Sequence, residues 1–133
     1  MNSNPLSLFL RRVLLFDAAT CLLTGAVMLA AGGAVERLLA IPAQVSGALG
    51  VVLLAFGAAV AWVGTRPHLL RPAVWGIIAL NALWAIESVL ALAFGWLEPN
   101  ALGQAFIIGQ AVAVAVIAEL QFVGLRRARP VTA

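Results

Sequence analysis

The sequence contains almost none of the residue types from which most catalytic and metal sites are built. Its 133 residues include one histidine, one cysteine and no lysine, and only 10% are charged. A single cysteine, Cys21, excludes an internal disulfide and a metal site built from cysteines. The single histidine, His68, cannot supply the two axial imidazoles of a membrane cytochrome, and HExxH and CxxC motifs are absent. We therefore expect no metal and no cofactor. Catalysis is disfavoured, although paired carboxylates alone keep it open.

Apolar residues in long runs dominate what is present. Hydrophobic residues make up 64% of the chain, compared with roughly 45–50% in soluble domains. A soluble fold of this length could not bury so much apolar surface. The runs at 45–64 and 73–97 contain no Arg, Lys or Asp, and a bilayer is crossed by about 20 apolar residues. The chain is therefore predicted to be a polytopic membrane protein with the lipid bilayer as its partner.

The predicted fold class is all-α, with four transmembrane helices in one up-down-up-down bundle formed by residues 1–133. The helices are expected at about 13–34, 46–65, 73–97 and 101–125. Residues 1–12 are expected at the headgroup layer, and a short interfacial turn of helix is expected to end at Pro42. Ser46 is expected to start the second segment as its N-cap. Either Pro99 or Asn100 is expected to start the fourth segment. Pro72 suits the first turn of the third segment.

A cleaved signal peptide is the alternative interpretation of the first segment. Two arginines precede its apolar run, and Ala30 and Ala31 resemble a cleavage site. Asp17 and Thr20 interrupt that run, however, and the run is long enough to span a bilayer. We therefore expect the first segment to be retained.

The basic residues are all arginines, and their distribution predicts the topology. Seven of the eight share one side of the predicted bundle: Arg11, Arg12, Arg66, Arg71, Arg126, Arg127 and Arg129. Arg37 lies on the other side. The positive-inside rule then places both termini in the cytoplasm of a bacterial cell, with the chain multi-pass in the inner membrane. Because the net charge of +3 reflects this topology, we expect no nucleic acid partner.

Glu87 is the principal candidate for a functional residue. It lies near the middle of the segment between Trp75 and Trp96, where an acid costs roughly 2.5–3.5 kcal/mol. Four residues of this segment fall within an arc of about 120°: Asn81, Trp84, Glu87 and Ser88. Gln110 of the fourth segment lies at a similar depth. We expect Glu87 to turn toward the protein, within a pocket that these residues line, either as a binding group or as a neutral acid bonded to Gln110.

Two further acids lie nearer the cytoplasmic side. Asp17, Thr20, Cys21 and Thr24 have the spacing i, i+3, i+4, i+7, so they share a helix face that must turn toward protein. Asp17 could instead pair with Arg11 or Arg12. Glu119, near a helix C-terminus, needs a cation from the set Arg12, Arg66 and Arg126. Asp17 and Glu119 are predicted to form a second, cytoplasmic tier, and Thr24 is a further candidate site residue on the helix face of Asp17.

Small residues form a stripe on the second segment. Gly50, Gly57 and Gly64 recur every seven residues, with Ala61 four after Gly57, and such stripes let helices approach closely. The stripe predicts packing within the bundle or, alternatively, the seam of a homodimer or larger membrane complex. A direct repeat is also indicated, because Asp17, Ala18 and Thr24 align with Asn81, Ala82 and Ser88. It would relate the two hairpins by a pseudo-twofold axis along the membrane normal.

The chain contains the stretches LRRVLLFD (10–17), LNALW (80–84) and AELQF (118–122). In these it resembles an uncharacterised family of small bacterial four-helix integral membrane proteins. The resemblance implies the fold but no activity, ligand or partner. The chain is also similar to small multidrug-resistance transporters in having four short helices and a carboxylate in the first. The sequence around that carboxylate differs from the pattern of those transporters, so we do not infer drug efflux for this chain.

Three functions fit these patterns. The first is binding or relay of a proton or a small polar or cationic solute through the intramembrane carboxylates, with Glu87 as the main group. The second is an accessory or scaffold subunit of a larger membrane complex. The third is a pocket for a lipid or quinone headgroup around Trp84 and Glu87.

Overall fold

The computed structural model describes residues 5–128, which fold into five helices. They are α1 (Leu8–Ala30), α2 (Gly32–Leu39), α3 (Ala43–Gly64), α4 (Arg71–Ala93) and α5 (Ala101–Arg127). Four of them, α1, α3, α4 and α5, are long and apolar enough to cross a membrane. The prediction of an all-α chain with four helices long and apolar enough to span a membrane is confirmed. Arg129 lies outside the described residues.

Local capping explains where several helices begin. α1 begins at Leu8, before the expected position 13, because the Ser7 hydroxyl accepts a hydrogen bond from the Leu10 amide at 3.2 Å. α5 begins at Ala101, as expected, since Asn100 Oδ1 accepts from the Gly103 amide at 2.8 Å. Ser46 was wrongly expected to cap α3, which begins after Pro42 and leaves Ser46 inside the helix.

The remaining helix ends also differ from the expected bounds. α1 ends at Ala30, and α2 follows after a single residue, Ala31. α2 in turn ends at Leu39, and its C-cap Ala40, two residues before Pro42, has a positive φ of 58°. α4 carries Pro72 in its first turn, as predicted, and ends at Ala93 rather than near position 97. These differences shift the ends of the candidate spans, but the number of spans stays at four.

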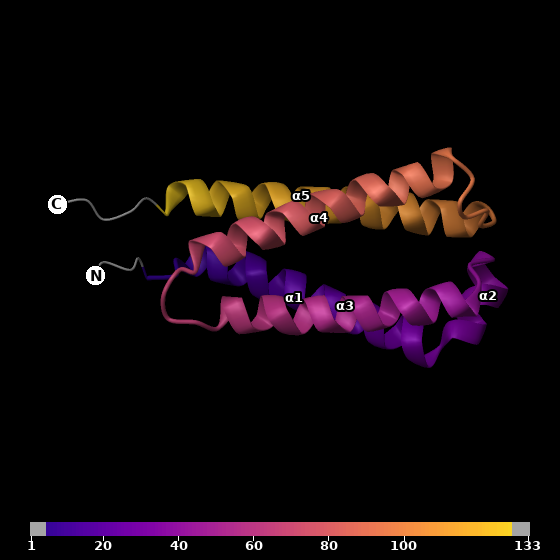
Figure 1. The fold of residues 1–133 in the computed structure, drawn as a ribbon, viewed down its shortest axis with the longest axis horizontal. Helices are drawn as coiled ribbons and strands as arrows, with labels where there is room; N and C mark the ends of the chain where they lie inside the picture. The colour runs from indigo at the N-terminus through magenta and orange to yellow at the C-terminus, as the bar shows by residue number, and fades with distance from the viewer. Residues whose placement is uncertain (1–4, 129–133) are drawn as a thin grey trace.

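The long helices form two hairpins, α1 with α3 and α4 with α5 (Figure 1). α1 begins and α5 ends at the end of the bundle that also carries the α3–α4 loop (Figure 1). α3 and α4 are consecutive in the chain but contact each other far less than each contacts its hairpin partner. Sequence neighbours are therefore close neighbours within each hairpin, while the two hairpins meet mainly through α1 and α5.

The glycine stripe of α3 packs against α1 of the same chain. A Cβ added to Gly50 would lie 2.8 Å from the Gly25 carbonyl oxygen, and one added to Gly25 would lie 2.9 Å from the Gly50 carbonyl oxygen. Added Cβ atoms on Gly57 and Gly64 would lie 2.9 and 3.1 Å from side-chain atoms of α1. The stripe therefore allows the backbones of α1 and α3 to approach each other closely. Within one chain, α1 already covers the surface predicted as a homodimer seam.

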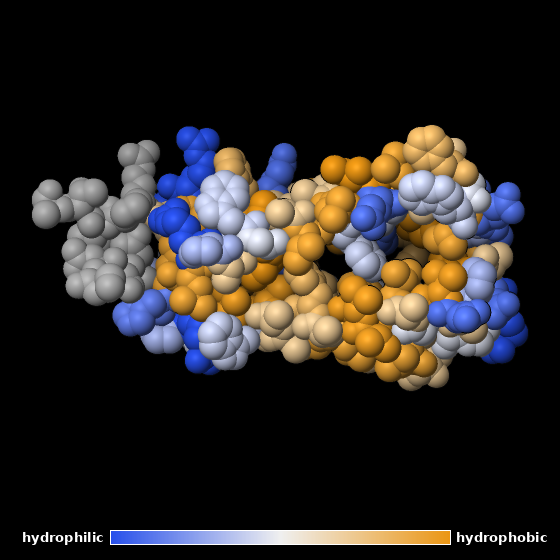
Figure 2. All heavy atoms as spheres, in the orientation of Figure 1, coloured by the Kyte–Doolittle hydropathy of each residue, from blue (hydrophilic) through white to orange (hydrophobic). Residues whose placement is uncertain are grey.

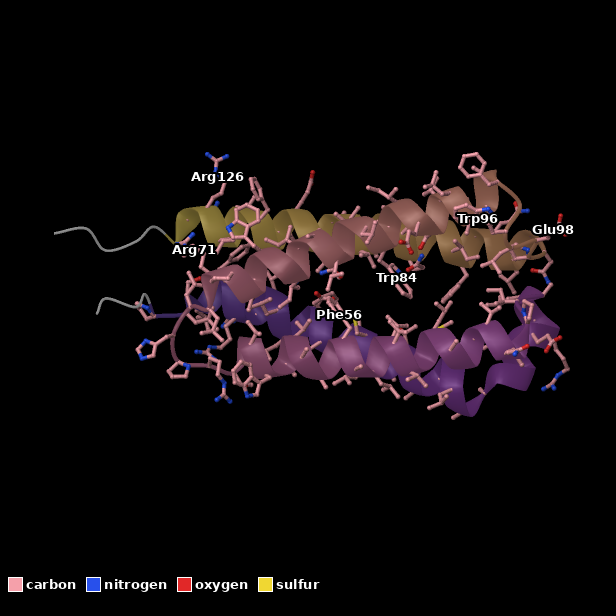
Figure 3. The ribbon with its side chains drawn as sticks, viewed as in Figure 1. Phe56, Arg71, Trp84, Trp96, Glu98 and Arg126 are labelled. Carbon is pink, nitrogen blue, oxygen red and sulfur yellow. The ribbon has the colours of Figure 1, made fainter. Side chains whose placement is uncertain are left out.

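The hairpins are joined firmly at the end that carries the arginines, here called the arginine end. Apolar side chains from both hairpins pack there, namely Leu6, Leu10, Leu14, Ala18, Val60, Val63, Val74, Ile77 and Leu125. Arg11 closes the end of α3 by donating to the carbonyls of Gly64 at 2.7 Å and Arg66 at 3.1 Å. Figure 3 shows Arg71 and Arg126 at this end and Trp96 and Glu98 at the other.

The opposite end is joined through backbone contacts of α2. The Asn100 amide donates to the Leu39 carbonyl at 3.1 Å, and Asn100 Nδ2 donates to the Leu38 carbonyl at 2.9 Å. Gly103 also lies against the Leu39 carbonyl, which leaves no room for a side chain. Between the two joined ends, Figure 2 shows a hollow separating the hairpins.

Candidate functional site

Asp17 is the centre of a buried polar cluster that ties three helices together. Its side chain on α1 is 1% exposed. Oδ2 accepts hydrogen bonds from Asn81 Nδ2 on α4 at 2.8 Å and from Gln121 Nε2 on α5 at 2.7 Å. Asn81 Nδ2 also donates to Gln121 Oε1 at 3.0 Å. Both amides are buried, so the cluster joins the two hairpins through the interior of the bundle.

The Asp17 carboxyl receives all of these bonds from neutral groups. On its other oxygen, Oδ1 accepts from Cys21 Sγ at 3.5 Å. No arginine among residues 5–128 forms an ion pair with it. The alternative pairing with Arg11 or Arg12 is wrong, because Arg11 is bound to the carbonyls that end α3. An ionised carboxylate in an apolar interior is stabilised by such donors only in part.

The geometry of this cluster suits either protonation state of Asp17. Oδ2 can accept both amide hydrogens whether the group is a carboxylate or a carboxylic acid. The proton of the acid form then falls on Oδ1, beside the Cys21 sulfur, which can act as a weak donor or a weak acceptor. Neither amide can take up or release a proton at ordinary pH.

A second polar cluster lies within the α4–α5 hairpin. Trp84 Nε1 donates to Gln110 Oε1 at 2.8 Å, and Gln110 Nε2 donates to Ser88 Oγ at 2.9 Å. Ser88 Oγ in turn donates to the Trp84 carbonyl at 2.8 Å. All three side chains are half-buried. The predicted grouping of Trp84, Ser88 and Gln110 is therefore present as a closed set of hydrogen bonds.

This second cluster faces the space between the hairpins. Figure 3 shows Trp84 projecting from α4 toward that space and Phe56 projecting into it from α3. In Figure 2 the hollow lies on the side of the bundle's middle away from the arginine end, and hydrophilic atoms line its α4 side. A polar group entering the hollow would meet the indole and amide of this cluster.

Glu87 does not turn toward the protein interior, and that expectation is wrong. Its side chain is exposed and forms no hydrogen bond or ion pair with another residue of the described chain. The reason is rotational. Asn81 points at Asp17, and a residue six positions later points about 120° away from it on an α-helix. Gln110, the expected partner of Glu87, is bonded to Trp84 and Ser88 instead.

Glu119 and Thr24 also stand apart from both clusters. Glu119 is exposed and pairs with none of its expected arginines in the part of the chain described, so its predicted ion pair is wrong. Arg66 donates to the Trp62 carbonyl, and Arg126 lies over the ring of Phe122. Thr24 is half-buried on the α1 face that carries Asp17, without a hydrogen bond from its hydroxyl to a described residue.

Gln121 is the site residue that the sequence analysis missed. It is fully buried at 0% exposure and takes the inward position near the depth predicted for Glu119. A usable signal existed, because Gln121 follows Gln110 by eleven residues, which is about three helical turns and a rotation of about 20°. Gln110 and Gln121 therefore had to share a face, and Glu119 had to lie nearly opposite.

Together these features indicate a multi-pass membrane protein, because the helical bundle has four candidate transmembrane helices and polar residues in its interior. Two hairpins of spanning helices enclose the Asp17–Asn81–Gln121 cluster, and one hairpin carries the Trp84–Gln110–Ser88 cluster. The chain matches no protein-family model, no curated protein and no solved structure. The resemblance to bacterial four-helix membrane proteins therefore stays a prediction.

Proposed function

We propose that this protein binds or relays a proton, or a small polar or cationic solute, with Asp17 as the central group. The observation that carries the proposal is a fully buried carboxyl group whose hydrogen-bond donors among residues 5–128 are all neutral and come from both hairpins. This assignment replaces Glu87 with Asp17 as the main carboxylate. Asn81, Gln121 and Cys21 orient it.

The choice of an acid at this position supports a functional role. An amide at position 17 could also bond to Asn81 and Gln121, at a lower cost of insertion into hydrocarbon. The carboxyl group adds the capacity to carry charge. Hydrogen bonds to an ionised acceptor are roughly twice as strong as those between neutral groups. Loss or uptake of a proton, or neutralisation by a bound cation, therefore changes how tightly α4 and α5 are held to α1.

The arginine end indicates how the protein would be oriented in the membrane. The arginines that close helix ends at this side of the bundle favour the cytoplasm under the positive-inside rule. In that orientation both termini are cytoplasmic, and the membrane is a bacterial inner membrane. Asp17 lies nine residues after Leu8, about 14 Å along α1 from this side. A proton would then reach Asp17 from the cytoplasm over about half the span.

Infrared difference spectroscopy on the purified protein in lipid tests the proposal without knowledge of the solute. A pH jump should produce a carboxylic-acid C=O band that disappears in Asp17→Asn and persists in Glu119→Gln. The second variant is a matched control, since it neutralises an exposed acid of the same bundle. Proteoliposomes containing a pH-sensitive dye then report whether proton movement depends on Asp17. An unchanged band and unchanged proton movement in Asp17→Asn would refute the proposal.

A second candidate function is binding of an amphipathic molecule, such as a lipid or quinone, with its polar headgroup at the Trp84–Gln110–Ser88 cluster. The hollow beside Trp84 favours it, because the half-buried indole and amide offer hydrogen bonds to a headgroup there. Quenching of tryptophan fluorescence by an added short-chain quinone, compared between wild type and Trp84→Phe, tests this candidate. Equal quenching in the two proteins would count against it.

A further inference from the structure

A recess at the arginine end of α5 is not used by either proposed function. It has a volume of about 430 Å³ and is lined by Phe122, Val123, Arg126 and Arg127. Its walls combine two apolar side chains with two guanidinium groups, and it lies in the last turns of a spanning helix. Such a position corresponds to the boundary between hydrocarbon and headgroups.

The arginines of this end divide into two groups by what they bind. Arg11 and Arg66 donate hydrogen bonds to backbone carbonyls at the end of α3. Arg71 does the same for α5, donating to the carbonyls of Leu125 at 3.4 Å and of Ala128. These three side chains satisfy backbone acceptors that a helix end leaves without partners.

Arg126 and Arg127 have no such structural task. Both are exposed, and neither donates a hydrogen bond to a residue within 5–128. Each guanidinium carbon lies 5.6 Å from the centre of an aromatic ring, Arg126 over Phe122 and Arg127 over Phe9. A ring holds the guanidinium in place but leaves its N–H donors available for another acceptor. Arg71 already serves the end of α5, so these two arginines are not needed as its caps.

The apolar wall of the recess is also held in place. The ring of Phe122 packs edge-on against Trp75 of α4, with centroids 5.7 Å apart and planes at 63°. The acid nearest along α5 is Glu119, two turns and about 10 Å before Arg126, and it forms no ion pair with either arginine in the described structure. Among the described residues, therefore, no acid offsets the charge of the two arginines.

We propose that this recess binds the phosphate headgroup of an anionic phospholipid. Arg126 and Arg127 would hold the phosphate, since guanidinium groups match its oxygens bidentately. Phe122 and Val123 would lie against the glycerol and the first carbons of the acyl chains. The apolar wall favours a lipid over free phosphate, which would gain nothing from it.

Lipid titration by native mass spectrometry tests the site on the whole chain, with phosphatidylglycerol added against a phosphatidylcholine background. Arg126→Gln and Arg127→Gln should each weaken retention of phosphatidylglycerol by about five- to tenfold. Arg12→Gln is the matched control, because Arg12 is an exposed arginine of the same end that does not line the recess. It should change retention by about twofold or less.

Val123→Trp is a second test, which changes the shape of the recess and leaves the charge of its two arginines unchanged. It fills the recess, and it should weaken retention of phosphatidylglycerol to a similar degree with both arginines in place. Equal losses for Arg12, Arg126 and Arg127 would overturn the proposal, because general surface charge would explain them. Displacement of the lipid by millimolar inorganic phosphate, or normal retention in Val123→Trp, would also overturn it.

Discussion

Removing the Asp17 side chain should destabilise the bundle more than replacing it with the amide of the same shape. In Asp17→Ala, Gln121 Nε2 loses its acceptor, while the Asn81 amide keeps its bond to Gln121 Oε1. In Asp17→Asn, an oxygen at the Oδ2 position still accepts from both amides. The new amide nitrogen then takes the Oδ1 position beside Cys21.

The expected magnitude follows from the bonds that are lost. Hydrogen bonds between helices in membrane proteins contribute about 0.6 kcal/mol each, and Asp17→Ala removes two that come from amides. A buried amide donor left without a partner adds about 1–3 kcal/mol. The free energy of unfolding should therefore fall by roughly 2–4 kcal/mol in Asp17→Ala, but by about 1 kcal/mol or less in Asp17→Asn.

Reversible unfolding in mixed micelles of SDS and a mild detergent, followed by far-UV circular dichroism, measures these differences. Glu119→Ala is the control, because it removes an exposed acid that has no partner in the described chain, and it should change stability by about 0.5 kcal/mol or less. If Asp17→Ala behaves like this control, the hydrogen bonds to Asp17 do not stabilise the bundle. Equal losses in the Ala and Asn variants would also refute the reasoning, since the charge rather than the hydrogen-bond geometry would then dominate.

Three further predictions use the same unfolding assay. Gly50→Val should cost about 1–3 kcal/mol or more, because its Cβ would lie 2.8 Å from the Gly25 carbonyl oxygen, while Gly109→Ala, in open space, should be neutral or stabilising. Ser46→Ala should stabilise by about 1 kcal/mol, because the buried hydroxyl has no hydrogen-bond partner; a loss of stability would contradict this. Trp84→Phe should cost about 0.6 kcal/mol through its lost bond to α5, and an unchanged protein would show that the bond contributes nothing.

The candidate site could be predicted only in part from the sequence. The spacing of polar residues correctly grouped Trp84 with Ser88, and their contact with Gln110 followed from depth. Depth alone could not decide between Gln121 and Glu119, which are two residues apart and point in nearly opposite directions. The rotation of α5 about its own axis decides that choice.

Local sequence features were enough to predict four helices long and apolar enough to span a membrane, the end that gathers most of the arginines, and the start of α5 close to Ala101. Each of these depends on hydrophobicity or hydrogen bonding over a few consecutive residues. Which side of each helix faces inward depends on how the helices pack together, and this packing places Asp17 inside and Glu87 outside. A helix in lipid is apolar on its outer side as well as its inner side, so hydrophobic periodicity does not mark the buried face. Close contacts such as that between Gly25 and Gly50 help to set this rotation, and they exist only when the helices meet.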